Sequence, residues 1–180
     1  YFVAALCSIT LYFTVSPFIS VWLGDEYIMP QLIILLLSLH VFLQQARLTV
    51  DNFKNGYGIY DDVWAPIAEV IIFLGLAVIL GHYYGLAGIL TGMVVSEVLI
   101  KMVWKPYYLF KKGFEVSVLR HYWPVIIKYI VLFALCILFT GWISSQYQDA
   151  FDVRGWIPVL LYCVTIGTTV ATTLTLLFSI

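Results

Sequence analysis

Long runs of apolar residues alternate with short polar segments along the whole chain. Each run is about 20 residues long, the length that a helix needs to cross roughly 30 Å of hydrocarbon. Helices satisfy their own backbone hydrogen bonds in lipid, so such runs predict transmembrane helices. The pattern therefore predicts an all-α polytopic membrane protein with about six transmembrane helices, at residues 1–23, 31–50, 65–80, 86–104, 123–143 and 156–180.

The composition supports a membrane protein and excludes an ordinary soluble domain. Hydrophobic residues make up 63% of the chain and charged residues 11%, whereas a soluble domain is nearer half apolar and a quarter charged. The net charge of −1 gives no reason to expect nucleic acid as a partner. The chain begins inside an apolar run and without a methionine, so we expect it to be a fragment of a longer protein.

The basic residues lie on alternate connections, which predicts the orientation. All but Arg154 of the nine lysines and arginines flank the second and fourth connections. Because these residues are enriched in cytoplasmic loops, we expect both ends of the chain on the cytoplasmic side of the inner membrane. The chain then divides into four helices at 1–104, a basic cytoplasmic connection at 105–122 and two helices at 123–180. That connection is either an amphipathic segment on anionic lipid or an ordinary positive-inside loop.

A polar stripe interrupts the second apolar run. Its members are spaced by four, three and four residues, which places them on one helical face: His40, Gln44, Arg47 and Asp51. A polar face in a membrane helix should turn towards protein or water. We interpret the stripe as part of the lining of a transport cavity, while an Arg47–Asp51 pair at the helix end is the simpler alternative. His40, the deepest member, either changes protonation near neutral pH or is hydrogen-bonded to a neighbouring helix.

Two glutamates lie in the following runs. Glu69 stands one turn into the third run, after Pro66. It either complements the positive end of that helix or is a cavity carboxylate that pairs with Arg47 or binds a cation or proton. Glu97 has Lys101 four residues later, which favours a local ion pair. Small residues at helical spacing in the fourth run, from Gly85 to Ser96, predict close packing of a neighbouring helix.

Motifs of covalent chemistry are absent from the sequence. It contains no phosphate-binding loop, no dinucleotide-binding glycine motif and no nucleophile with its base. The cysteines, Cys7, Cys136 and Cys163, lie inside apolar runs without metal-ligand spacing. We therefore expect no catalytic residue, no metal site, no cofactor and no enzyme activity.

Four segments together resemble the Wzx-type lipid-linked oligosaccharide flippases, which belong to the multidrug, oligosaccharidyl-lipid and polysaccharide exporter superfamily. The segments make up about a third of the chain, and they are FISVWLGDEY at 18–27, RLTVDNFKNGYGIYDDVWAPIAEV at 47–70, YYGLAGILTGMVVSEV at 83–98 and KPYYLFKKGF at 105–114. The resemblance implies the C-terminal part of a two-lobe transporter with twelve to fourteen helices.

The same resemblance implies the substrate and the partners. The substrate would be an oligosaccharide on undecaprenyl diphosphate, such as a repeat unit of O-antigen, capsule or exopolysaccharide, flipped across the cytoplasmic membrane by alternating access. The partners would be this substrate, membrane lipids and the N-terminal lobe of the same chain. Arg47 would be a cation for the diphosphate, because guanidinium groups suit phosphate.

Three other functions stay open. A cation-coupled drug antiporter of the same superfamily would need a carboxylate deep in a helix. A polysaccharide polymerase or ligase would need a substantial outer loop with basic and catalytic groups. A non-transporting membrane scaffold would tolerate the loss of Arg47.

Overall fold

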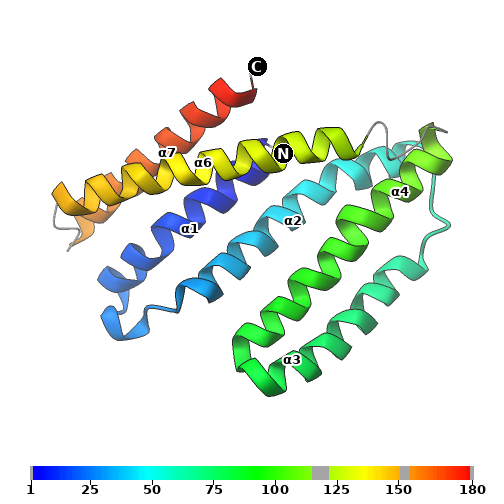
Figure 1. Cartoon of the computed structure of the whole chain (residues 1–180), viewed down its shortest axis with the longest axis horizontal. Coiled ribbons are helices and arrows are strands. Elements are labelled where there is room, and N and C mark those ends of the chain that lie inside the picture. Colours follow the sequence, from blue (N-terminus) through cyan, green and yellow to red (C-terminus); the bar gives the residue numbers. More distant parts are fainter. Residues whose placement is uncertain (1, 115–121, 151–154, 179–180) are drawn as a thin grey trace. The chain divides into compact units, whose positions relative to one another are not determined.

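The computed structural model describes residues 2–114, 122–150 and 155–178, and within these ranges the chain is helical with no strand (Figure 1). Four helical stretches of the described chain are long and apolar enough to cross a membrane, namely Phe2–Trp22, Gln31–Gly56, Trp64–Phe114 and Trp156–Leu176. The expectation of an all-helical fold is therefore confirmed for the described residues, and the four apolar helices have the length and composition of membrane spans. The number of six spans stays a prediction, because the third and fourth runs form one helical stretch and Phe133–Gln146, in the fifth, is a shorter apolar helix.

The chain divides into two compact units. The first unit comprises Tyr1–Ser38 and Tyr129–Ile180, and the second comprises Leu39–Lys128. The first contains α1 (Phe2–Trp22), η1 (Asp25–Tyr27), α7 (Trp156–Phe178), the start of α2 (Gln31–Gly56) and most of α6 (Trp123–Ala150). The second contains the rest of α2, then α3 (Trp64–Glu97), η2 (Val98–Trp104), α4 (Lys105–Leu109) and η3 (Phe110–Phe114).

In the first unit, α1 packs along α7. Small residues near the start of α1, including Ala4, Ala5 and Ser8, are buried and allow close approach. The facing stripe of α7 is buried at every third or fourth residue, at Val159, Tyr162, Ile166, Val170 and Leu174. The Ser8 hydroxyl donates to the carbonyl of Ser38 at 2.7 Å. Helix packing in this unit thus combines an apolar seam with satisfied polar groups.

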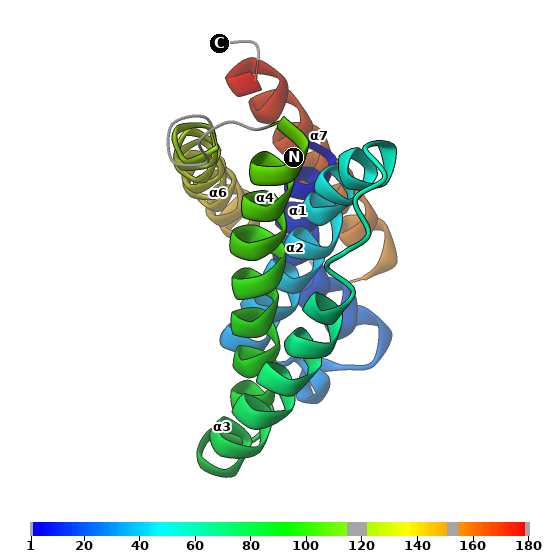
Figure 2. The same ribbon diagram turned by 90° about the vertical axis from the view of Figure 1, so that its right-hand side faces the viewer.

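In the second unit, α3 is a helical hairpin that turns at Gly85. The φ of +59° and ψ of −135° at Gly85 lie outside the helical region, and a positive φ suits glycine. The two arms lie side by side in Figures 1 and 2. A Cβ atom at Gly88 would lie 2.0 Å from the carbonyl oxygen of Leu80 on the facing arm. The predicted close packing of small residues is confirmed, and the neighbour is the first arm of the same hairpin.

Two helical segments continue beyond their predicted ends. The second run was expected to end at Val50, but α2 continues to Gly56; the fourth was expected to end at Trp104, but the helix continues to Phe114. Asp51 from the first extension pairs with Lys105 from the second, at 2.7 Å. The polar residues that indicated loops are therefore partners across two helices. The first part of the predicted connection at 105–122 is helical, and residues 115–121 lie outside the described residues.

Candidate functional site: an ionic network between α2 and the hairpin

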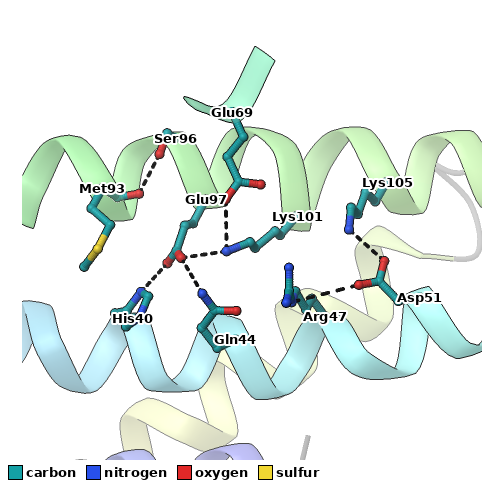
Figure 3. A network of polar contacts seen from close by, with 10 residues as sticks. All are labelled: His40, Gln44, Arg47, Asp51, Glu69, Met93, Ser96, Glu97, Lys101 and Lys105. Carbon is teal, nitrogen blue, oxygen red and sulfur yellow. Dashed lines mark hydrogen bonds and ion pairs between the residues drawn. The ribbon is translucent and has the colours of Figure 1, made fainter. Parts of the chain in front are cut away.

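The polar stripe of α2 faces the second arm of the α3 hairpin and its continuation η2 (Figure 3). The Nδ1 atom of His40 lies 3.0 Å from one carboxylate oxygen of Glu97, and the Gln44 amide donates to the other oxygen at 3.0 Å. An ionised carboxylate only accepts hydrogen bonds, so the proton of a neutral His40 must lie on Nδ1. The Glu97 side chain is only 4% exposed. Two members of the predicted stripe thus converge on one buried carboxylate.

Lys101 joins that carboxylate to a second one. Its ammonium lies 2.6 Å from Glu97 and 3.0 Å from Glu69, and its side chain is 2% exposed. Glu69 lies on the first arm of the hairpin, whereas Glu97 and Lys101 follow the turn. Glu69 and Lys101 stand at equal sequence distances from Gly85, so an antiparallel hairpin places them side by side. This end of the network holds two carboxylates and one ammonium, an excess of one negative charge when both glutamates are ionised.

The other end of the network has the opposite excess. Asp51 is bound by the Lys105 ammonium at 2.7 Å, while Nε of Arg47 lies 3.9 Å from the second carboxylate oxygen of Asp51. That separation exceeds a hydrogen bond. Among the described residues, no group accepts a hydrogen bond from this buried Nε atom. Two cations therefore share one carboxylate, and the Arg47 side chain remains 35% exposed.

The network costs free energy unless all its charges are kept paired. Moving an ion out of water costs several kcal/mol even after relaxation, and removing one member of a buried pair costs about 3–5 kcal/mol. The three acids Asp51, Glu69 and Glu97 balance the three bases Arg47, Lys101 and Lys105 when His40 is neutral. The balance holds over the whole network but not at either end. The arrangement can therefore attract a cation or proton beside Glu97 and an anion beside Arg47.

The connection between α2 and α3 packs against α4, at the end of the helical stretch that carries Glu97 and Lys101. Ile59 packs with Val50 and Leu109 in a small apolar cluster. The ammonium of Lys54 donates to the buried carboxylate of Asp62. These contacts hold the connection in place beside the Arg47 end of the network.

A second ion pair, between Asp61 and Lys112, lies on the surface of this connection. The ammonium of Lys112 donates a hydrogen bond to the Asp61 carboxylate and lowers its pKa from the ordinary value of 3.8. Both side chains are well exposed, so solvent screens their attraction.

The structure brings together all five sequence-predicted site residues, with partners that differ in part from those expected. His40 and Gln44 bind Glu97, and Asp51 binds Lys105. Pairing with Arg47 was one of the alternatives for Glu69, but its partner in the structure is Lys101. The expected Arg47–Asp51 pair exists only at the long distance of 3.9 Å.

Sequence reasoning missed the residues of the facing helix, Glu97, Lys101 and Lys105. The spacing of Glu97 and Lys101 correctly predicted an ion pair between them, but it gave no sign that the pair also holds α2. The signal that was available is the symmetry about Gly85, which places Lys101 opposite Glu69. Lys101 also lies on a π-helical segment, a feature often found at functional sites.

Comparison with models of protein families, with curated proteins and with solved structures finds no match. What the fold and the network define is therefore a class: a protein whose described residues form apolar helices long enough to cross a membrane, with a buried ionic network between them.

Proposed function

We propose that this chain is part of a transporter that flips an oligosaccharide linked to undecaprenyl diphosphate from the inner to the outer leaflet by alternating access. Ionisable residues within apolar helices are costly, and they mark the paths of ions and substrates in membrane proteins. The family resemblance of the sequence supplies the substrate class. The lipid tail needs a lateral opening, the sugars a polar surface and the diphosphate one or more cations.

The observation that carries the proposal is the unequal sharing of charge at Arg47. Asp51 is already held by Lys105 at 2.7 Å, so the Arg47 guanidinium shares that carboxylate only at the longer distance of 3.9 Å. A guanidinium that is one third exposed and only partly neutralised is suited to a diphosphate oxygen, because charge-assisted hydrogen bonds to phosphate are strong and directional. Arg47 would bind the diphosphate, and the rest of the network would hold Arg47 in place.

A complementation assay with the full-length protein tests this role. Arg47→Ala should reduce export of the lipid-linked glycan by about 10- to 100-fold, the equivalent of a lost charged hydrogen bond of roughly 1.5–3 kcal/mol. Lys111→Ala is the matched control, because Lys111 is an exposed cation outside the network. Both variants must be present in the membrane at equal amounts. Equal export by the two variants would reject the role of Arg47.

A cation- or proton-coupled antiporter is the second candidate, and the contact between His40 and Glu97 favours it. Both glutamates lie near one end of their predicted spans, yet Glu97 is buried and contacts the deepest residue of the stripe. The excess negative charge beside Lys101 would be balanced by a proton on His40 or by a monovalent cation. His40→Gln should then abolish drug extrusion driven by a pH gradient in vesicles. Unchanged extrusion in His40→Gln, or none in the wild type, would reject this candidate.

A further inference from the structure

The first unit contains a polar cavity of its own. It has a volume of about 200 Å³ and is lined by residues of α1, α2, α6 and α7. Its polar lining consists of hydroxyl and amide groups, from Tyr12, Ser16, Gln31, Ser144 and Tyr162. Among the described residues that line it, none is an aspartate, glutamate, lysine or arginine. A cavity of this kind suits a neutral ligand with several hydrogen-bonding groups.

Pro17 explains why part of this cavity is polar. Proline has no N–H, so the carbonyl of Phe13, four residues earlier in α1, loses its helical partner. The hydroxyl of Tyr162 on α7 donates to that carbonyl at 3.3 Å. The proton of Tyr162 is thereby used, so Ser144 on α6 donates to the Tyr162 oxygen, at 2.7 Å. The Ser144 oxygen keeps acceptor capacity for a group inside the cavity.

Three further polar groups on the wall are not hydrogen-bonded to any other residue that the structure describes. The side chains of Tyr12, Ser16 and Gln31 make no hydrogen bond to another described residue. Tyr12 and Ser16 are half-buried and Gln31 is exposed, so their polar groups are open to water or to a ligand. Together with Ser144 they offer both donors and acceptors around one small space.

The size and the walls narrow the chemical class of the ligand. At roughly 30 Å³ per water molecule, the cavity has room for about six or seven waters. A single sugar ring with its hydroxyl groups is of similar size. The rings of Tyr12 and Phe13 form part of the wall, which suits the apolar faces of a sugar ring. A lipid phosphate or a cation would find no opposite charge on the described wall.

We propose that this cavity is a binding subsite for one neutral sugar residue, and this proposal rests on the proposed function because the sugar would belong to the transported glycan. The four helices contribute from corresponding ends. Ser144 lies near the end of α6, Tyr162 near the start of α7 and Gln31 at the start of α2. By the distribution of lysine and arginine, these ends belong to the side opposite the basic connections. The subsite would hold the glycan on the side where it is released.

Saturation-transfer NMR on the full-length protein in phosphatidylcholine nanodiscs tests the subsite. The preparation must avoid detergents with sugar headgroups, which would compete. The probes are methyl glucoside, methyl galactoside and N-acetylglucosamine, with glycerol as a polyol too small to fill the cavity. At least one sugar should give a saturable signal that glycerol does not reproduce.

Two variants change the cavity, and one matched control leaves it intact. Gln31→Leu and Ser16→Leu should each weaken the sugar signal about two- to tenfold, the effect of a lost hydrogen bond of roughly 0.5–1.5 kcal/mol. Ser145→Ala should leave it unchanged, because Ser145 is exposed and donates to the carbonyl of Trp142 in its own helix. No saturable sugar signal, the result for a cavity that holds only water, would overturn the proposal. A signal that persists undiminished in both leucine variants would also overturn it.

Translocation of the lipid-linked glycan, measured on the same preparations, separates the two proposals. Sugar binding without translocation would reject the flippase function and keep the subsite. Translocation without sugar binding would reject the subsite and keep the function.

Discussion

Replacing Lys101 by methionine is the sharpest perturbation of the ionic network. Methionine keeps most of the length and apolar character of the lysine side chain, so the substitution removes the charge with little change in packing. Glu97 and Glu69 would then lose the ammonium that joins them at 2.6 and 3.0 Å. Glu97 would retain His40 and Gln44, whereas Glu69 would keep only its partial contact with solvent.

The expected loss of stability follows from these contacts. Breaking a buried ion pair costs about 3–5 kcal/mol, because the charge left behind has no partner. The Glu69 side chain is 21% exposed, and the two remaining partners of Glu97 reduce the penalty. We therefore expect Lys101→Met to lower the free energy of unfolding by about 3 kcal/mol, at the lower end of that range.

Lys111→Met is the matched control for this substitution. Lys111 is exposed and lies 5.6 Å from the ring centre of Tyr107, a contact worth about 0.5–1 kcal/mol at most. Adding Glu69→Gln to Lys101→Met removes the carboxylate that is left without a partner and should restore more than half of the lost stability. A single variant that is as stable as the control, or a double variant less stable than the single, would refute the reasoning. Equilibrium unfolding of the full-length protein by dodecyl sulfate in mixed micelles measures all three differences.

Other predictions concern the connection and the hairpin. Asp62→Asn should destabilise the protein by about 2–4 kcal/mol because its ion pair is buried, whereas Asp61→Asn should cause no measurable loss because its pair is exposed; equal melting of the two variants would contradict this. Carboxyl NMR should give Asp61 a pKa below 3.8 that returns towards 3.8 in Lys112→Gln. The pair then contributes to stability above pH 3.8, and this contribution is lost as the pH falls through the lowered pKa. An unchanged pKa in the variant would show that Lys112 is not the cause. Gly88→Ala should destabilise the protein by about 2 kcal/mol or more, since its Cβ would lie 2.0 Å from a backbone oxygen, whereas Gly75→Ala should be tolerated because nothing lies within 4 Å; similar thermal stability of both would contradict close packing of the two arms.

Much of the fold follows from the sequence, because apolar runs of bilayer length leave the backbone little choice but helix. The prediction failed at the ends of two helices. Lys105 was expected to begin the basic connection, yet it continues the helix and pairs with Asp51, the last residue of the stripe. A pairing between residues so far apart in the sequence leaves no trace in local periodicity.

Of the candidate site, the sequence predicted the stripe on α2 and Glu69 on the first arm of the hairpin, but not the residues that face them. The spacing of His40, Gln44 and Arg47 defines a polar face, but a single sequence does not say which residues face it. Glu97 and Lys101 looked self-sufficient at a spacing of four residues. Their contacts with α2 and with the first arm depend on the turn at Gly85 and on the packing of three helical segments.

Translocation by the purified full-length protein tests the central claim most directly. Proteoliposomes would carry the undecaprenyl-diphosphate oligosaccharide in both leaflets, and an added glycosidase would measure the fraction reached from outside. The account predicts that the protected inner-leaflet fraction disappears with wild-type protein and persists with Arg47→Ala. Protection that persists with the wild type, or that disappears equally fast with both proteins, would contradict it.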